Sequence, residues 1–284
     1  MARRNLPSDQ NLKPQLQDAM KIAIIGAGNM GGATARGLAK GTIVRNEDIS
    51  VSNPSRPKLD ALEQAFPHIR TTQNNRECVK GADLVILAVK PWKVEEVILE
   101  IRDVLDYSKV AVASMAAGMG TETVSRCLER NDGSTLPPVY YIIPNTAIAV
   151  QQSMTFISGT RADKVTDNAL LDIFNELGCA MMIDERQMNA GMALASCGIA
   201  YAMRYIRAAT EGGVELGMYA HEAQQIVAQT LKGAVSLLEA NHSHPEAEID
   251  KVTTPGGITI KGLNAMERNG FSNSVIEGLK ASKK

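Results

Sequence analysis

The chain has 284 residues, of which 44% are hydrophobic and 21% are charged, a composition typical of a globular protein and unlike that of a disordered one. At about 150 residues per domain, this length predicts two domains. The 30 basic residues are balanced by 31 acidic ones, so we expect no nucleic-acid partner, because no excess positive field would attract phosphate.

Membrane insertion and metal binding are also not expected. The sequence contains no run of 18 apolar residues, which predicts no transmembrane helix. The four cysteines form no C-x-x-C pair, so we expect reduced thiols in a cytoplasmic protein. The pair His242 and His244 has no cysteine nearby to complete a zinc site. Residues 1–19 lack the apolar segment of a secretory signal, and we interpret them as a polar extension that precedes a functional start at Met20.

The region 20–180 alternates short apolar runs rich in β-formers with amphipathic segments. The predicted strands are Ile22–Ile25, Ile49–Asn53, Leu84–Val89, Val110–Ser114 and Val139–Ile143. Predicted helices between them include Asn29–Lys40, Lys93–Leu105 and Thr121–Arg130. Strands separated by helices are typical of a doubly wound parallel sheet, so we expect an α/β domain over 20–180.

The sequence changes character after Gly159. No proline occurs between Pro144 and Pro245, and Ala, Met, Leu and Glu become frequent. The predicted helices of this part are Arg186–Leu216, Ala220–Asn241 and Gly256–Arg268. We therefore expect an all-helical domain over 181–284. So few helices are marginally stable alone, which predicts packing against the sheet domain or a second copy.

The clearest chemical signal is a glycine motif that directly follows the first predicted strand. The segment Lys21–Gly32 passes from that strand through a G-x-G-x-x-G turn, formed by Gly26, Gly28 and Gly31, into a helix of small residues. Gly26 would allow the tight turn, Gly28 would let a pyrophosphate approach the backbone, and Gly31 would let helix and strand pack closely. The motif predicts a dinucleotide site at the helix N-terminus; a glycine-rich turn without a ligand is the alternative.

The end of the second predicted strand favours NADPH, with NADH possible. An NAD site commonly places Asp or Glu there to bond the ribose hydroxyls. This chain instead has Ser52, Asn53 and Arg56, which offer a hydroxyl, an amide and a guanidinium to a 2′-phosphate. The alternative for Arg56 is a solvated loop charge.

Two further segments follow later strands of the predicted sheet. Ala88, Lys90 and Pro91 lie at the far end of one strand, and Ala116 and Ala117 come after the next. Doubly wound folds bind ligands at the carboxyl ends of their strands, so we expect these residues along the cofactor. For Lys90, a structural or phosphate-facing charge is favoured over a catalytic acid.

A second candidate anion site lies near the C-terminus. Thr254 suits a helix N-cap, and Pro255 suits the first helical position. Gly256 and Gly257 would each cost a helix about 1 kcal/mol relative to alanine. Bare N–H groups at a helix start would hold a carboxylate, and Thr259, one turn further, would donate its hydroxyl to the substrate. A flexible capping turn or a close helix contact is the alternative.

Six short segments stand in a characteristic order from Met20 to the C-terminus. They are Gly26–Gly31, Leu87–Pro91, Ala116–Gly118, Pro144–Thr146, Glu211–Gly213 and Val252–Ile260. Together they resemble the Δ1-pyrroline-5-carboxylate reductase family. The chain departs from the family's usual Ser-Gly-Ser-Gly-Pro-Ala-Tyr motif, where it has Ala195–Tyr201, and Lys251 stands where an amide residue is common.

The resemblance implies a Rossmann domain followed by a helical dimerisation domain that self-associates. It implies NADPH-dependent reduction of pyrroline-5-carboxylate to L-proline, the last step of proline biosynthesis. The implied cofactor contacts are Gly28, Asn29 and Met30 at the pyrophosphate, Ser52, Asn53 and Asn75 near the adenosine, and Ala88, Lys90, Pro91, Ala116 and Ala117 on the nicotinamide side. The implied substrate contacts are Thr254, Gly257, Ile258 and Thr259, to which we add the N–H groups of Gly256 and Gly257 as carboxylate donors.

Thr259 is the expected catalytic residue. Its hydroxyl has too high a pKa to be a strong acid, so we expect it to orient the ring or relay a proton through water. One alternative is a β-hydroxyacid dehydrogenase, which needs a helix-borne lysine, and the region 186–241 offers only Lys232. Another is a non-catalytic protein that senses NADP.

Overall fold

The computed structural model describes residues 20–282 and divides into two compact units, the first ending at Glu185 and the second beginning at Arg186. The expected polar extension, residues 1–19, lies outside the described residues. The division follows Glu185 rather than residue 180, because the strand Gly178–Met182 still pairs with the sheet of the first unit.

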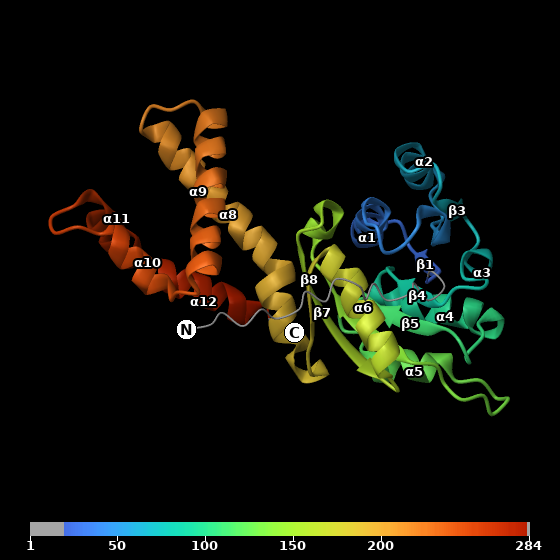
Figure 1. Ribbon diagram of the computed structural model, residues 1–284. Coiled ribbons are helices and arrows are strands. Elements are labelled where there is room, and N and C mark those ends of the chain that lie inside the picture. The colour runs from blue at the N-terminus through green and yellow to red at the C-terminus, as the bar shows by residue number, and fades with distance from the viewer. Residues whose placement is uncertain (1–19, 283–284) are drawn as a thin grey trace, which may run out of the picture. The chain divides into compact units, whose positions relative to one another are not determined.

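The first unit is built on an eight-stranded sheet in the order β3-β2-β1-β4-β5-β6-β7-β8 (Figure 1). Neighbouring strands are parallel except β6 and β7. The strand order reverses between β1 and β4, which is the position where doubly wound folds bind ligands. The predicted class, a doubly wound parallel sheet followed by helices, is confirmed. The strands are β1 (Ile22–Ile25), β2 (Ile49–Ser52), β3 (Arg70–Thr72), β4 (Leu84–Leu87), β5 (Ala111–Ser114), β6 (Val139–Ile143), β7 (Ser153–Thr160) and β8 (Gly178–Met182).

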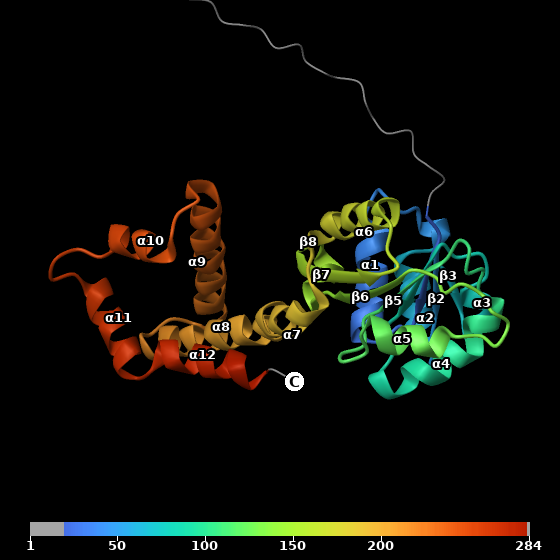
Figure 2. The same ribbon diagram turned by 90° about the horizontal axis from the view of Figure 1, so that it is seen from below.

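Helices cover both faces of this sheet. Figure 2 shows α1 and α6 on one face and α4 and α5 on the other. Ile22 and Ile24 pack in the core cluster that includes α1 and α6, whereas Ala23 and Ile25 pack in the cluster that includes α4 and α5. Two covered faces explain why β1 and β4 are continuously apolar. The helices of this unit are α1 (Asn29–Lys40), α2 (Arg56–Ala65), α3 (Asn75–Cys78), α4 (Val94–Ile101), α5 (Thr121–Leu128) and α6 (Lys164–Glu176), with 3-10 turns η1 (Asn46–Asp48), η2 (Pro91–Lys93), η3 (Arg102–Val104) and η4 (Thr146–Val150).

Three strands were not predicted. β3 is short and polar, and its sequence, Arg-Thr-Thr, carries no hydrophobic alternation. β8 is Gly-Cys-Ala-Met-Met, which lacks the β-branched and aromatic residues enriched in strands. β7 and β8 both follow the last predicted strand, and β8 runs to Met182, so the helical part begins after Met182 and not at residue 181 as expected.

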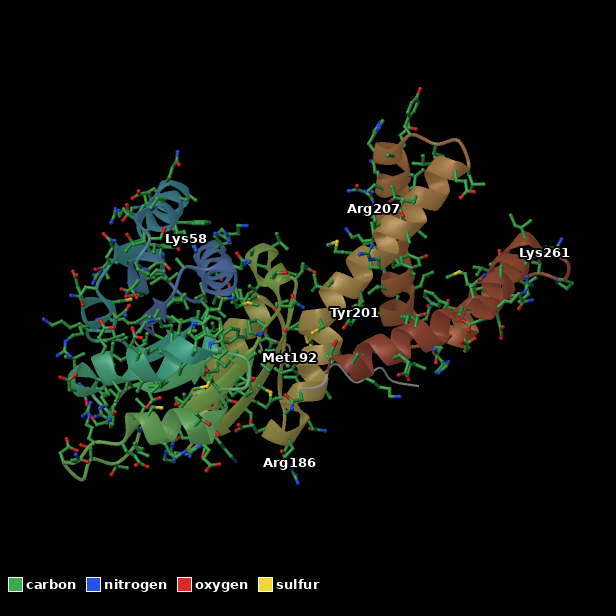
Figure 3. All side chains as sticks on the ribbon, turned by 180° about the vertical axis from the view of Figure 1, so that it is seen from behind. Lys58, Arg186, Met192, Tyr201, Arg207 and Lys261 are labelled. Atoms are coloured by element: carbon green, nitrogen blue, oxygen red, sulfur yellow. The ribbon has the colours of Figure 1, made fainter. Side chains whose placement is uncertain are left out.

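The second unit is entirely helical among the described residues. α8 packs against α9, and a Cβ at Gly213 on α8 would lie 2.8 Å from the Cβ of Ala223 on α9, so glycine allows this close approach. Tyr201, labelled on α8 in Figure 3, donates its hydroxyl to Gly278 O on α12 at 3.2 Å. The elements are η5 (Glu185–Gln187) at the boundary, then α7 (Met188–Gly191), η6 (Met192–Cys197), α8 (Gly198–Glu215), α9 (Ala220–Asn241), α10 (Pro245–Val252), α11 (Ile258–Arg268) and α12 (Phe271–Ala281).

The long helix predicted over Arg186–Leu216 is interrupted by a π-helical segment, η6. This segment ends at Cys197, inside the motif in which the chain departs from the family pattern. A π-turn accommodates extra residues by widening the helix, and such turns are frequent at functional sites. The prediction of one continuous helix therefore did not reveal the change of helix type.

The helical unit leaves many large apolar side chains exposed. Among its described residues, the buried apolar side chains are Met188, Ala193 and Ala223. A unit with so small a core of its own needs another surface to cover its apolar face. No helix within residues 20–282 is long and apolar enough to cross a membrane. Exposed apolar residues of α8, α9 and the turn between them are Met203, Val214, Leu216, Met218, Tyr219, Ile226, Val235 and Leu237.

Candidate active site

The glycine motif forms a tight turn between β1 and α1. Gly26 has a φ of 105°, a conformation that favours glycine, and its N–H donates to Ser52 O at 2.8 Å. A Cβ at Gly26 would lie 2.6 Å from Ala88 O. A Cβ at Gly31 would overlap Gly26 O. Glycine is therefore required at both positions to bring β1, β4 and the start of α1 together.

Gly28 occupies the N-cap position of α1 and provides an open anion cradle. It has no side chain to cap the helix, and the first turn carries no acidic residue. A Cβ at Gly28 would meet no atom within 4 Å, in contrast to Gly26 and Gly31. The N–H groups of Asn29, Met30 and Gly31 lie in the first turn, where no helical carbonyl is available to accept their hydrogen bonds. This arrangement fits the pyrophosphate of a dinucleotide.

The side chains of Ser52 and Asn53 are buried at the end of β2, where they form hydrogen bonds with other residues of the protein. Asn53 Oδ1 accepts the N–H of Ala27 at 3.1 Å, and its Nδ2 donates to Ser55 O at 3.1 Å. The Ser52 hydroxyl donates to Asn75 Oδ1 at 2.7 Å. These hydrogen bonds fix the shape of the glycine turn, so the structure places these residues beside the cofactor edge but with their side chains already engaged.

Cys78 lies under the same strand end. Its Sγ contacts Ile24 O at 3.8 Å, and burial raises the pKa of the thiol to about 11. The thiol therefore stays protonated and unreactive at neutral pH. Asn75, three residues earlier, donates from Nδ2 to Glu100 at 2.8 Å. Ser52, Asn75 and Glu100 thus form one chain of hydrogen bonds beyond β2.

Arg56 begins α2 and is about half exposed. Its Nε donates to Asp60 at 2.6 Å and its Nη2 pairs with Glu63 at 2.9 Å. The hydrogen bond to Asp60 and the charge of Glu63 raise the pKa of the guanidinium. Its Nη1 makes no hydrogen bond within the described residues. Arg56 therefore keeps one donor group for an anion, while two carboxylates fix its orientation.

The end of β4 lies next to the glycine turn. The N–H of Ala88 donates to Ile25 O at 2.9 Å, so this residue continues the strand pairing beside Gly26. Lys90 is exposed and precedes the 3-10 turn Pro91–Lys93. Trp92, the one tryptophan of the chain, lies in that turn and is 75% exposed. The structure thus places Ala88, Lys90 and Pro91 along the edge that carries the glycine motif.

The loop that follows β5, Met115–Gly120, is held by several hydrogen bonds. The Met115 N–H donates to Leu87 O at 3.0 Å, and the Met119 N–H donates to Ala116 O at 3.0 Å. Gly118 has a φ of 81°, and its N–H donates to the hydroxyl of Tyr141 at 3.0 Å. Burial raises the pKa of Tyr141, so its hydroxyl stays neutral. The loop that contains Ala116 and Ala117 is therefore held in place at the carboxyl end of β5, one strand away from the switch point.

The C-terminal segment differs from its prediction. α11 begins at Ile258 with Gly257 as its N-cap, so the predicted N-cap at Thr254 and first helical position at Pro255 are wrong. The N–H of Gly257 donates to Thr254 O at 2.9 Å, and Gly256 has a φ of 73°. Proline followed by glycine with positive φ is the pattern of a type II turn, which leaves the chain in a turn where a helix start was expected.

This turn changes which N–H groups are available. The N–H of Gly257 is engaged in the turn, whereas those of Ile258 and Thr259 lie in the first turn of α11. A Cβ at Gly257 would lie 2.6 Å from Thr254 Oγ1, so glycine is needed for the turn to close. The Thr259 side chain is exposed and makes no hydrogen bond within the described residues. The segment presents a helix N-terminus and a hydroxyl side by side.

A hollow of about 540 Å³ lies elsewhere, at the amino-terminal ends of β1, β4 and β5. Its lining carries both signs of charge, from Lys21, Arg45, Asp83, Asp106 and Lys109. It is remote from the glycine turn, which follows the other end of β1. Within residues 20–282 no group of three or more His, Cys, Asp or Glu side chains could hold a metal ion; His244 instead caps α10 by accepting the Glu246 N–H at 3.3 Å.

Known proteins resemble this chain in sequence over nearly its whole length. Pyrroline-5-carboxylate reductase 2 of Dictyostelium discoideum is 35% identical over 93% of this chain and 91% of its own length. The chain belongs to the pyrroline-5-carboxylate reductase family. The pyrroline-5-carboxylate reductase of Methanosarcina acetivorans is 34% identical over 93% of this chain and 97% of its own. Pyrroline-5-carboxylate reductase 1 of Dictyostelium discoideum is 37% identical, and the chain spans 48% of its length.

Domain and structure comparisons agree with this family. Residues 185–284 match the family model for pyrroline-5-carboxylate reductase dimerisation, and residues 21–118 match the model described as NADP oxidoreductase coenzyme F420-dependent. The pyrroline carboxylate reductase of Plasmodium falciparum, crystallised with NADP bound, has a TM-score of 0.82 at 25% identity and covers 93% of this chain and 95% of its own. The reductase of Coxiella burnetii has a TM-score of 0.81 at 28% identity, over 93% and 96%.

The residues expected to bind the cofactor of a pyrroline-5-carboxylate reductase thus gather at one edge of the sheet, and those expected to bind the substrate lie together in the helical unit. Sequence reasoning missed the residues that hold the loop after β5. Thr121 and Glu185 are 64 positions apart yet hydrogen-bonded, and Tyr141 comes from a third element. No local pattern signals such contacts, because they depend on tertiary structure.

Proposed function

We propose that this chain reduces pyrroline-5-carboxylate to L-proline with NADPH. The observation that carries the proposal is the open N-cap at Gly28, which combines free N–H groups with space for a pyrophosphate. Family membership supports the reaction, and the matched NADP oxidoreductase model supports the cofactor. The reaction needs a bound hydride donor and a bound substrate. We assign the residues at the carboxyl ends of the strands to the first and those at the start of α11 to the second.

The cofactor would lie along the carboxyl ends of the strands. Asn29 and Met30 would bind the pyrophosphate through their backbone N–H groups, and Arg56 would bind the 2′-phosphate through Nη1. Ala116 and Ala117 would line the nicotinamide side without blocking it. When bound, the reduced nicotinamide supplies the hydride that is added to the carbon of the substrate's C=N bond.

The substrate carboxylate would be bound by the start of α11. Because the Gly257 N–H is engaged in the turn, the donors we propose are those of Ile258 and Thr259, where the helix dipole also favours an anion. The Thr259 hydroxyl would orient the ring or relay a proton to its nitrogen, since a protonated imine accepts hydride far better than a neutral one. Fixing the ring in this way lowers the barrier by alignment.

The direct test is consumption of NADPH. The protein is mixed with NADPH and pyrroline-5-carboxylate, and the absorbance of the reduced nicotinamide is followed while proline is quantified. We expect both to change in equal amounts. NADPH binding without consumption would contradict the proposal and support the NADP-sensing alternative. The assay repeated with NADH measures the cofactor preference.

Arg56 is predicted to set that preference. We expect Arg56→Ala to raise the KM for NADPH about tenfold and to leave the KM for NADH within about twofold, because only NADPH carries the 2′-phosphate. Arg45→Ala is the matched control, since Arg45 also pairs with a carboxylate, Asp48, but lines the hollow at the opposite edge. Equal effects on the two cofactors would exclude a contact between Arg56 and the phosphate.

Self-association is predicted to bury the exposed apolar face of α8 and α9. Ile226 on α9 is 50% exposed, and Leu237, three helical turns further along the same face, is 51% exposed. We expect Ile226→Glu to weaken association at least about tenfold, because an unpaired buried carboxylate is costly. Gln225→Glu adds the same charge at the neighbouring exposed position and should have little effect. Light scattering over a dilution series measures both, and an unchanged mass for Ile226→Glu would place the interface elsewhere.

A further inference from the structure

The loop Met115–Gly120 is followed by α5, and a carboxylate from a distant part of the chain holds the point where they join. Glu185 Oε1 accepts the N–H of Thr121 at 3.0 Å, and Glu185 Oε2 accepts the Thr121 hydroxyl at 2.5 Å. Thr121 is the first residue of α5 and is buried. The carboxylate thus caps the helix in place of the preceding residue, Gly120, which has no side chain.

We infer that Glu185 is a positioning residue that fixes the nicotinamide-side loop Met115–Gly120 for hydride transfer. The inference rests on the proposed function, which assigns Ala116 and Ala117 of this loop to the nicotinamide side. Glu185 reaches the loop from one end, while Tyr141 holds Gly118 in its middle. Burial, and to a lesser extent the charge of Glu185, raises the pKa of Tyr141, so its hydroxyl is neutral where it accepts the Gly118 N–H.

The geometry around Gly120 shows how closely the carboxylate approaches the backbone. A Cβ at Gly120 would overlap Glu185 Oε1, so glycine at this position is what lets the carboxylate reach the helix N-terminus. The φ of Gly120 is −71°, a value that any residue can adopt, so conformation does not demand glycine here. Glycine is therefore required at position 120 because of the space that the Glu185 carboxylate occupies, and not because of the backbone conformation.

The other end of α5 is held independently. Arg102 Nη1 donates to Cys127 O at 3.3 Å and to Glu129 O at 2.7 Å, and the Tyr107 hydroxyl donates to Leu128 O at 2.6 Å. With its C-terminal end fixed by these donors, α5 would remain in place if Glu185 were lost. The freedom gained would be confined to its first residues and to the loop before them.

The consequence for the reaction differs from that of losing a cofactor contact. Under the proposed function the pyrophosphate and adenosine parts would be bound at Gly28 and beyond β2, away from Glu185, so binding of the dinucleotide should persist. A displaced loop would instead misplace the nicotinamide ring, and a misplacement of about 1 Å can slow a reaction about 100-fold. Glu185 should therefore affect kcat more than the affinity for NADPH.

The test compares Glu185→Ala with Glu185→Gln. We expect Glu185→Ala to lower kcat about tenfold, to change the Kd for NADPH less than about threefold, and to raise the isotope effect measured with NADPH deuterated at C4. Glu185→Gln keeps an oxygen for the Thr121 N–H and should recover most of kcat. If the substitution only destabilised the protein, a smaller fraction of the molecules would be active, but the isotope effect of that fraction would be unchanged.

Glu176 offers a matched control in the same unit. Its carboxylate accepts the N–H groups of Thr42 and Ile43 and the Thr42 hydroxyl, and a Cβ at Gly41 would overlap it. It clamps the loop after α1, far along the chain from the nicotinamide-side loop. Glu176→Ala should lower the Tm as Glu185→Ala does, with kcat and the isotope effect unchanged.

A double-mutant cycle tests the contact itself. Gly120→Ala should reproduce the kinetic defect of Glu185→Ala, because the new Cβ displaces the carboxylate. In the double variant Gly120→Ala/Glu185→Ala, the second change should add no further defect, since no carboxylate remains to be displaced. Additive effects would contradict the positioning role.

Hydrogen exchange separates this inference from the proposed reaction. In the wild-type protein, NADPH should protect the amides of residues 115–121, and Glu185→Ala should abolish that protection while retaining it at residues 26–32. If the wild-type protein consumes no NADPH with pyrroline-5-carboxylate but shows this pattern, the proposed reaction fails, whereas the positioning of the loop by Glu185 is supported. Unchanged protection and an unchanged isotope effect in Glu185→Ala would overturn the inference.

Discussion

Gly28→Ala is expected to lower the affinity for NADPH about 100-fold while leaving the Tm within a few degrees of the wild-type value. The reason is the space around Gly28, where an added Cβ would meet no protein atom but would stand where the pyrophosphate approaches the backbone. Its backbone, with φ −72° and ψ −164°, is accessible to alanine. Isothermal titration calorimetry with NADPH and a thermal melt measure the two quantities.

Two neighbouring glycines make the comparison decisive. Gly32→Ala places its Cβ in ordinary contact, 3.4 Å from Ala27 O, and should retain NADPH binding. Gly31→Ala should lose both binding and stability, because its Cβ would overlap Gly26 O. If Gly28→Ala binds NADPH as the wild-type protein does, the pyrophosphate does not lie at this helix N-terminus and the proposed site is wrong.

Thr259→Ala is expected to lower kcat about 100-fold with little change in the Kd for NADPH, because the hydroxyl acts on the substrate and not on the dinucleotide. Thr259 has a free hydroxyl on an exposed helix start, so its loss removes no hydrogen bond within the described residues. The protein should therefore remain folded. Steady-state kinetics with each substrate varied in turn, together with calorimetry for NADPH, measure the separation.

Two companion variants define the role of the hydroxyl. Thr259→Ser keeps the hydroxyl and should restore most of kcat. Thr230→Ala removes a hydroxyl that is bonded to Ile226 O at 2.9 Å on α9, and it should leave kcat unchanged. Full activity of Thr259→Ala would show that backbone N–H groups alone hold and activate the substrate.

The sequence predicted best where local chemistry and tertiary structure demand the same residues. The helix Asn29–Lys40 and the strand Val139–Ile143 were predicted with their observed bounds, and the glycine motif stands between β1 and α1 as expected. Gly26 and Gly31 must be glycine because of contacts within one βα unit and the adjacent strand, which explains why a short motif identifies them. The choice between NADPH and NADH remains a prediction.

Prediction was less successful where residues far apart in the chain decide the structure. The hydrogen bond between the Ala27 N–H and Asn53 Oδ1 could not be predicted from the sequence, since the same side-chain amide could equally have faced a ligand. The error at Pro255-Gly256 is a local one: the pair suits both a helix start and a type II turn, and the positive φ of Gly256 places it in the turn. The Glu185 contact with Thr121 lacks any local signature.

Trp92 gives the molecule a built-in optical reporter. It is the one tryptophan of the chain, and it directly follows Pro91 at the cofactor edge. Indole emission overlaps the absorption band of reduced nicotinamide, so a dinucleotide held at this edge would quench the fluorescence of this side chain by resonance energy transfer. The six tyrosines emit at shorter wavelength, so selective excitation of the indole would follow cofactor occupancy from a single, known position.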